Sequence, residues 1–171
     1  MRNDHQPEPP LKFVAYVYVA ALLLILGCYN DGLSDYERAE QKKTQAKDQL
    51  EAIGAKFELK NFPQGDAWAI DLSGQTLNDE TFEQLASLGY IVELDLSNTN
   101  CNDDHLGVIN DTSIRYVLMK LDVSNTEISD HGMEKLKEMY LLKSMNVNGT
   151  DVTNSGIKTL KDAFPLVQVQ K

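Results

Sequence analysis

Hydrophobic residues recur at the same offsets in four stretches of the chain. The stretches begin at Ile70, Leu94, Leu121 and Met145, so successive starts lie 24, 27 and 24 residues apart. The first two apolar positions of each stretch are two residues apart, which places both side chains on one face of a strand. The last two are three residues apart, as on one face of a helix. Each unit is therefore predicted to be a strand, a turn and a helix.

Such a short unit cannot bury its own apolar face, so the copies are predicted to stack as a parallel sheet backed by helices. The repeated apolar positions are Ile70, Leu72, Leu77, Phe82, Leu85; Leu94, Leu96, Cys101, Leu106, Ile109; Leu121, Val123, Ile128, Met133, Leu136; Met145, Val147, Val152, Ile157, Leu160. Cys101 stands where the other copies have larger apolar residues, which indicates a small buried hydrophobe. The longer interval is predicted to bulge near residues 110–113, between a helix and the next strand.

The pattern L-x-L-x-x-(N or T)-x-L followed by a helix resembles the leucine-rich repeat over residues 67–169. It is most similar to short bacterial repeats of the form LDLSNTxITDxGL, which are related to the ribonuclease-inhibitor-like and F-box-associated branch. The resemblance implies an α/β solenoid of about four repeats, with a parallel sheet on the concave side. It also implies an amino-terminal cap around Phe57, Phe62 and Trp68, and a last strand supplied by Phe164, Leu166 and Val169.

Residues 13–30 carry no charge, and two interpretations of them stay open. A helix of this length would span a bilayer core. Alternatively, residues 13–26 are the apolar region of a secretion signal, and the following ILGC resembles a lipoprotein box in which Cys28 is lipidated. Residues 1–12 are then cytoplasmic or the first part of the signal. Both interpretations predict a membrane-anchored chain, single-pass or lipoprotein, with its repeat domain outside the cytoplasm and the membrane as a partner.

Residues 34–54 are predicted to form a helical stalk between this segment and a repeat domain over residues 55–171. Ser34 and Glu37 form a capping box, and Gly54 is a helix stop. The favoured interpretation is a solvated spacer helix whose last turns dock on the domain through Leu50 and Ile53. A self-associating coiled coil is the alternative.

The formal charge of −10 and the isoelectric point near 4.7 exclude nucleic acid as an expected partner, because phosphates are bound by clustered lysine and arginine. No catalytic motif is recognised, and we expect no enzyme activity, cofactor or metal. The nearest candidate metal set is Asp103, Asp104, His105, Asp130 and His131. The favoured interpretation is structural: Asn78, Asn102, Ser129 and Thr153, or the acids beside them, cap helix amino termini.

A polar row is predicted along the concave face, because the residue between the two inward positions of each strand points to the other side. The candidate ligand-binding residues are Asp71, Ser73, Asp95, Ser97, Asp122, Ser124, Asn146 and Asn148. Carboxylates in file on neighbouring strands attract a cation or a basic peptide. The expected partner is therefore an unknown protein or peptide of basic character.

Three functions compete at this point. The leading hypothesis is a non-enzymatic, membrane-tethered leucine-rich-repeat module that binds protein outside the cytoplasm. The second is a structural envelope protein that self-associates through its stalk or its solenoid edges. The third, implied only by the family branch, is an F-box-like substrate adaptor of a ubiquitin ligase.

Overall fold

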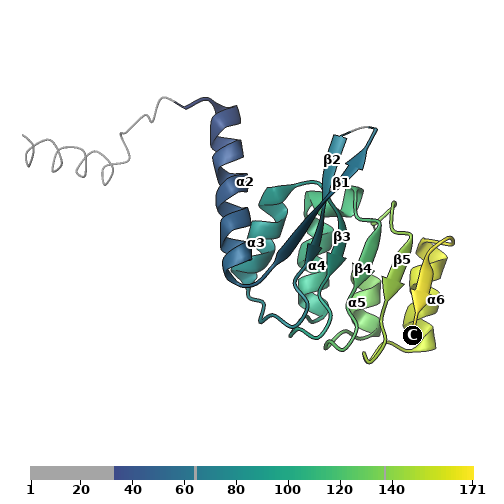
Figure 1. Cartoon of the computed structure of the whole chain (residues 1–171). Helices are drawn as coiled ribbons and strands as arrows, with labels where there is room; N and C mark the ends of the chain where they lie inside the picture. The colour runs from purple at the N-terminus through teal and green to yellow at the C-terminus, as the bar shows by residue number, and fades with distance from the viewer. Residues whose placement is uncertain (1–32, 64, 137) are drawn as a thin grey trace, which may run out of the picture. The chain divides into compact units, whose positions relative to one another are not determined.

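The computed structural model describes residues 33–63, 65–136 and 138–171 (Figure 1). The chain divides into two compact units, residues 1–39 and residues 40–171. The predicted stalk corresponds to helix α2 (Asp35–Ala52), which begins in the first unit and ends in the second.

The second unit is a mixed α/β structure, which confirms the predicted class. Its elements after α2 are β1 (Lys56–Phe62), β2 (Gly65–Asp71), α3 (Asp79–Leu88), β3 (Ile91–Asp95), α4 (Asp103–Asp111), the 3-10 helix η1 (Ser113–Tyr116), β4 (Lys120–Asp122), α5 (Asp130–Lys135), β5 (Ser144–Asn146), α6 (Asn154–Ala163) and β6 (Gln168–Gln170). The six strands form one sheet in sequence order. Helices α3 to α6 lie in a row along one face of the sheet, and we call the other face the open face (Figure 1).

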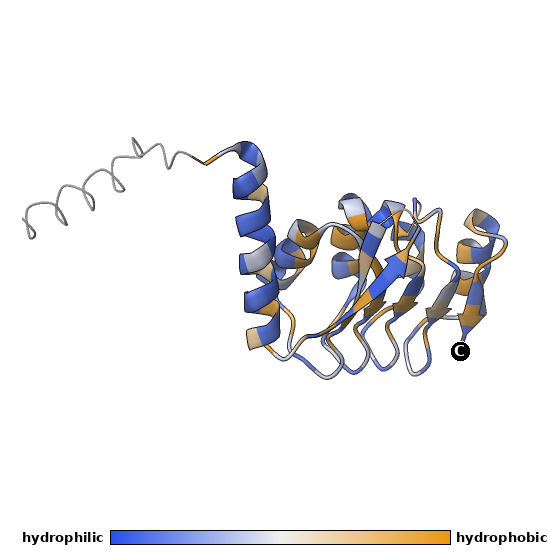
Figure 2. Ribbon diagram, turned by 45° about the horizontal axis from the view of Figure 1, so that its top comes forward, coloured by the Kyte–Doolittle hydropathy of each residue, from blue (hydrophilic) through white to orange (hydrophobic). Residues whose placement is uncertain are grey.

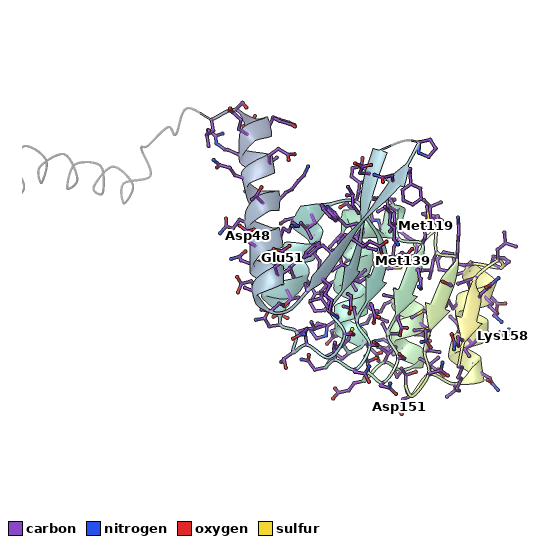
Figure 3. The ribbon with its side chains drawn as sticks, in the orientation of Figure 1. Asp48, Glu51, Met119, Met139, Asp151 and Lys158 are labelled. Carbon is purple, nitrogen blue, oxygen red and sulfur yellow. The ribbon has the colours of Figure 1, made fainter. Side chains whose placement is uncertain are left out.

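Strands β1 and β2 form an antiparallel hairpin, and each later strand pairs in parallel with the one before it. We call each strand with its following turn and helix a coil. The register places equivalent residues of successive coils side by side, in the file Ile70, Leu94, Leu121, Met145 and Val169. The strand-to-helix turns lie at the edge where Figure 3 labels Asp151, and the helix-to-strand connections lie at the opposite edge near Met119. Because Leu94 pairs with Leu121, the sheet keeps its register across the longer interval of 27 residues between these two strands.

The repeated apolar positions form one continuous core. Nineteen of the twenty are buried, and Ile157 packs against the core while partly buried. Figure 2 shows the hydrophobic residues concentrated on the strands and the helices behind them, while α2 is mainly hydrophilic. Cys101 is fully buried, and burial raises the pKa of its thiol to about 12. Its predicted role as a small buried hydrophobe is therefore confirmed.

The four predicted helix caps are also confirmed. Asn78, Asn102, Ser129 and Thr153 each accept a backbone N–H in the first turn of their helix. Acids at two of the helix starts clamp the next coil. Asp103 accepts hydrogen bonds from the backbone N–H of Ser129 at 2.8 Å and from its hydroxyl at 2.6 Å. Asp130 accepts the same pair from Thr153, both at 2.6 Å.

The hydrogen bonds of Asp103 and Asp130 leave no room for a side chain at two buried positions, Gly132 and Gly156. A Cβ added to Gly132 would lie 2.4 Å from Asp103 Oδ1, and one added to Gly156 would lie 2.3 Å from Asp130 Oδ1. Any side chain at these positions would therefore displace the carboxylate of the preceding coil. The helix layer and the turns are tied together by the same acids that resembled metal ligands in the sequence.

The bulge was predicted near residues 110–113, between α4 and β4. Residues 110 and 111 end α4, residue 112 links α4 to η1, and residue 113 begins η1. The next residue, Ile114, is only 1% exposed and so belongs to the core. Other expectations at the two ends of the domain also need correction. Phe62 is 36% exposed and Leu166 is 92% exposed, whereas Val167 is buried in place of Leu166.

The carboxy-terminal half of α2 belongs to the folded core. Ala46 and Leu50 are buried in the same cluster as the first strands, and the second unit starts at Glu40. Ile53, which was expected to dock beside Leu50, is 38% exposed. Lys47 lies over the rings of Phe57 and Trp68, at 5.3 Å and 5.8 Å from their centroids.

Within the described residues, no helix has both the length and the apolar character needed to cross a bilayer. The expected membrane-anchored localisation, single-pass or lipoprotein, is corrected by this finding, and the membrane is not carried forward as a partner. The predictions made for residues 1–12, for residues 13–30 and for lipidation of Cys28 fall on residues outside the described part of the chain.

Leu50→Ala is expected to lower the free energy of unfolding by about 3 kcal/mol, because it leaves a cavity in a fully packed site. Ile53→Ala, one turn away on the exposed side of α2, is the matched control and should cost under about 1 kcal/mol. Urea denaturation followed by circular dichroism measures both. Equal losses would show that α2 does not contribute to the core through Leu50.

Gly132→Ala is expected to destabilise the protein by about 2 kcal/mol, since its Cβ would break the Asp103 clamp on Ser129. Gly107→Ala is the control in the same helix layer. Its Cβ would meet only the flexible Lys135 side chain, at 3.3 Å, so the better helix propensity of alanine should leave stability equal or raised by about 1 kcal/mol. A thermal unfolding curve in which Gly132→Ala matches the unsubstituted protein would contradict the clamp.

Candidate functional site: the open face of the sheet

The polar row predicted from the sequence is assembled on the open face. Cα pairing sets Asp71 beside Asp95, Asp95 beside Asp122, and Asp122 beside Asn146. Gln170 continues the file on β6. The first four are all partly exposed, so three carboxylates and an amide stand on adjacent strands about 4.8 Å apart.

The second half of the predicted set orients this row. The backbone N–H groups of Ser73, Ser97 and Ser124 each donate to Oδ1 of the aspartate two residues earlier, at 2.9 Å. Asn148 makes the equivalent bond to Asn146 at 3.2 Å. Ser97 and Ser124 are only 8% exposed. The four turn residues therefore orient the row. Ser97 and Ser124 offer little surface of their own to a ligand, whereas Ser73 and Asn148 are partly exposed.

The outer oxygens of the row differ in what they already bind. Oδ2 of Asp71 accepts from the Lys56 ammonium at 2.9 Å. Oδ2 of Asp122 accepts from the Asn146 amide at 2.8 Å. Oδ2 of Asp95, between them, receives no hydrogen bond from the residues that the structure describes. The centre of the row is thus the point where a carboxylate oxygen remains available to a ligand.

A second row lies beside the first and was missed in the sequence. Pairing puts Ala69, Glu93, Lys120, Ser144 and Gln168 in one file. Lys120 and Glu93 approach to 3.8 Å. With Lys56 and Glu58 of β1, both rows line a hollow of about 330 Å³ over β1 to β4. The strand alternation could have found Glu93 and Lys120, but only the antiparallel hairpin brings Lys56 to Asp71.

Hydrogen bonds and charge together hold Asp71 in its ionised form. The Ser73 hydroxyl and the Lys56 ammonium lower the pKa of Asp71 to about 2, although burial opposes this shift. The same contact with Asp71 raises the pKa of Lys56. Asp71 and Lys56 consequently keep their opposite charges over the whole physiological pH range.

The acid and histidine set weighed as metal ligands does not form a site. Among the residues that the structure describes, no three histidine, cysteine or acidic side chains are placed to hold a metal ion. Asp103 and Asp130 clamp the next coil, and Asp104 pairs with Lys135 at 2.6 Å. His105 stacks on Phe82, with ring centroids 4.5 Å apart, and its Nδ1 accepts the backbone N–H of Asn102.

Comparisons with known proteins leave the family open. No family model matches the chain, and no curated protein matches it. A solved structure of Chaetomium Mex67:Mtr2 subunits is 16% identical with a TM-score of 0.43, and the match covers 53% of this chain and 64% of that chain. The likeness is too weak to support an inference about fold or function. None of these comparisons identifies the chain as a leucine-rich-repeat protein.

Asp71→Asn is expected to lower the free energy of unfolding by about 1 kcal/mol at neutral pH, because a partly exposed ion pair is screened by solvent. A carboxyl group whose pKa is lowered on folding stabilises the fold above its unfolded pKa, near 3.9. That contribution is lost as the pH falls through about 2. The difference between the two proteins should therefore shrink between about pH 5 and pH 2.

Urea midpoints measured across this pH range test the prediction. Asp66→Asn, the same substitution on the same strand, is the control. A gap between Asp71→Asn and the unsubstituted protein that stays constant down to the lowest pH would contradict the role given to Asp71.

Proposed function

We propose that residues 40–171 form a non-enzymatic protein-binding module that takes a cationic segment of a partner on the open face of the sheet. The single observation that carries this proposal is the row Asp71, Asp95 and Asp122, whose central carboxylate has an oxygen free of donors within the described residues. The coils, whose sequence resembles leucine-rich repeats, serve as the rigid solenoid scaffold that holds the row in place.

Charge supports a basic partner. The hollow over β1 to β4 is lined by Glu58, Asp71, Glu93, Asp95 and Asp122 against two lysines, Lys56 and Lys120. A third lysine of β1, Lys60, pairs with Glu58 at 2.8 Å. The formal charge of the whole chain is −10. A field of one sign over a hollow raises the local concentration of oppositely charged groups and repels phosphate backbones. An arginine or lysine of the partner would reach Asp95 while its neighbours contact the acids on either side.

The geometry also limits which segments fit. Lys56 donates a hydrogen bond to Asp71 at one end of the row, and the Asn146 amide donates one to Asp122 at the other. A ligand cation is therefore directed to the middle of the row, where it replaces no existing ion pair. Arginine suits this position better than lysine, because its planar fork can bond two carboxylate oxygens at once.

Affinity is expected to be modest and sensitive to salt. The two rows contain no aromatic or arginine side chain, the residue types that most often dominate interface energies. Binding through exposed charges weakens as the Debye length falls from about 10 Å in 0.1 M salt to about 3 Å in 1 M salt. A dissociation constant in the micromolar range is therefore expected at low salt.

Asp95→Asn is expected to weaken binding of an alternating arginine–serine peptide about tenfold, equivalent to about 1.4 kcal/mol. The substitution removes the central charge while keeping an oxygen for the Ser97 N–H. Glu83→Gln is the matched control, since it removes one exposed negative charge from α3 in the helix layer. Isothermal titration calorimetry of the full chain measures each affinity.

Lys56→Gln is expected to raise the affinity for the peptide, whereas Asp95→Asn lowers it. Removing this lysine frees Asp71 Oδ2 and should tighten binding of the same peptide about threefold, equivalent to about 0.7 kcal/mol. A glutamate–serine peptide of the same length is the ligand control and should not bind. Equal losses for Asp95→Asn and Glu83→Gln would show that only net charge matters, and the proposed site would be wrong.

A further inference from the structure

The four strand-to-helix turns share one backbone conformation but differ at one pair of residues. The residue at the left-handed position is Gly74, Asn98, Asn125 or Gly149, with φ of 73°, 57°, 54° and 68°. In the first three turns this residue follows a serine, and in the last it follows Asn148. Asn148 is the one asparagine of the chain that precedes a glycine. Because glycine has no side chain, it hinders the attack of its own backbone nitrogen on the preceding asparagine side chain less than any other residue.

The backbone N–H of this position also has a different environment in the last turn. The N–H of Gly74 donates to Ser97 O, that of Asn98 to Ser124 O, and that of Asn125 to Asn148 O, at 2.8 to 2.9 Å. Within the described residues, the N–H of Gly149 donates to no acceptor, and Gly149 is exposed. Its nitrogen can therefore react without first breaking a hydrogen bond between coils.

We propose that Asn148 is a site of spontaneous deamidation in the folded protein. The Gly149 nitrogen attacks Cγ of Asn148, so a N–Cγ bond forms and the Cγ–Nδ2 bond breaks. The side-chain amide leaves as ammonia, taking up the proton lost from the Gly149 nitrogen. Water then opens the resulting succinimide at either carbonyl and leaves aspartate or isoaspartate at residue 148. No oxidant, reductant or enzyme is required.

One hydrogen bond of the Asn148 side chain restrains the reaction, so a substitution that removes this bond should change the rate. The Asn148 amide is half-buried and donates to Asn146 Oδ1 at 2.8 Å, which holds the side chain against the row. Three other asparagines of the domain each make two or more side-chain hydrogen bonds. Asn78 and Asn102 cap helices through their side-chain oxygens, and Asn100 bonds both backbone groups of Leu77.

The product would alter the open face through Asn146. A carboxylate at residue 148 can no longer donate to Asn146 Oδ1, and the two oxygens would repel each other. Turning the Asn146 amide restores a hydrogen bond to the side chain of residue 148, but it withdraws the acceptor from the backbone N–H of residue 148 and the donor from Asp122 Oδ2. Deamidation would thus add one negative charge and free a second carboxylate oxygen of the row. This consequence for binding rests on the proposed function, whereas the reaction itself does not.

The reaction is tested by ageing the full-length chain in mildly alkaline and mildly acidic buffer and following its intact mass. The mass change that accompanies replacement of the side-chain NH2 by OH should appear faster in the alkaline buffer, because the attacking nitrogen loses its proton more readily there. Peptide mapping should locate it at residue 148 as a mixture of aspartate and isoaspartate. Asn148→Ser, which copies the other three turns, should remove at least nine-tenths of the mass change.

Asn146→Ala is the second variant, and it should speed the reaction at least twofold because it releases the Asn148 side chain. A mass change that persists in Asn148→Ser, or that maps to another asparagine, would overturn the proposal. So would an unchanged mass in the unsubstituted chain under conditions where a free peptide of residues 145–152 deamidates.

The consequence for binding has its own measurement. Asn148→Asp should bind the arginine–serine peptide about threefold more tightly than the unsubstituted chain. Deamidation at residue 148 with no gain in Asn148→Asp would refute the coupling through Asn146. No binding by any of the proteins would instead refute the proposed function, and the mass data would still decide the reaction.

Discussion

The structure depends on one constraint: a coil of about two dozen residues cannot bury its own apolar face. Leu94 and Leu121 are nearly inaccessible because each lies between equivalents on the neighbouring strands. The same requirement fixes the register, since a slip of one residue would turn the core side chains to the open face. The interval of 27 residues therefore keeps the sheet in register and folds its extra residues into η1, where Ile114 adds to the core.

The fixed register has a second effect on the polar residues. Because the side chains of a strand alternate, the residue after each of Ile70, Leu94, Leu121 and Met145 must point to the open face, and stacking puts these residues in file. Three of them are aspartates, which the turn N–H groups and Lys56 hold in place. At the helix starts, stacking lets Asp103 and Asp130 bond the cap of the next coil. A single repeat in the sequence thus serves the core, the clamps and the candidate site.

Some predictions from the sequence failed for identifiable reasons. Ile53 was expected to dock on the domain beside Leu50, yet only Leu50 is buried and Ile53 is 38% exposed, because a helix outside the repeats carries no periodic pattern that identifies its buried face. Leu166 was assigned to the last strand, although β6 begins only at Gln168, Leu166 is 92% exposed and the neighbouring Val167 is buried. Residues 103–105 and 130–131 resembled metal ligands because capping, clamping and metal binding use the same side chains.

The sequence by itself determined the α/β class, the inward and outward positions of each strand, the four helix caps and the burial of Cys101. These features follow from short periodicities and from capping chemistry that act within a few residues. Only the tertiary structure decided that Lys56 pairs with Asp71, that Asn146 covers Asp122, and that Asp95 keeps an oxygen free within the described part of the chain. Those facts depend on the antiparallel pairing of β1 with β2 and on the side-chain rotamers of the paired residues, and local sequence encodes neither.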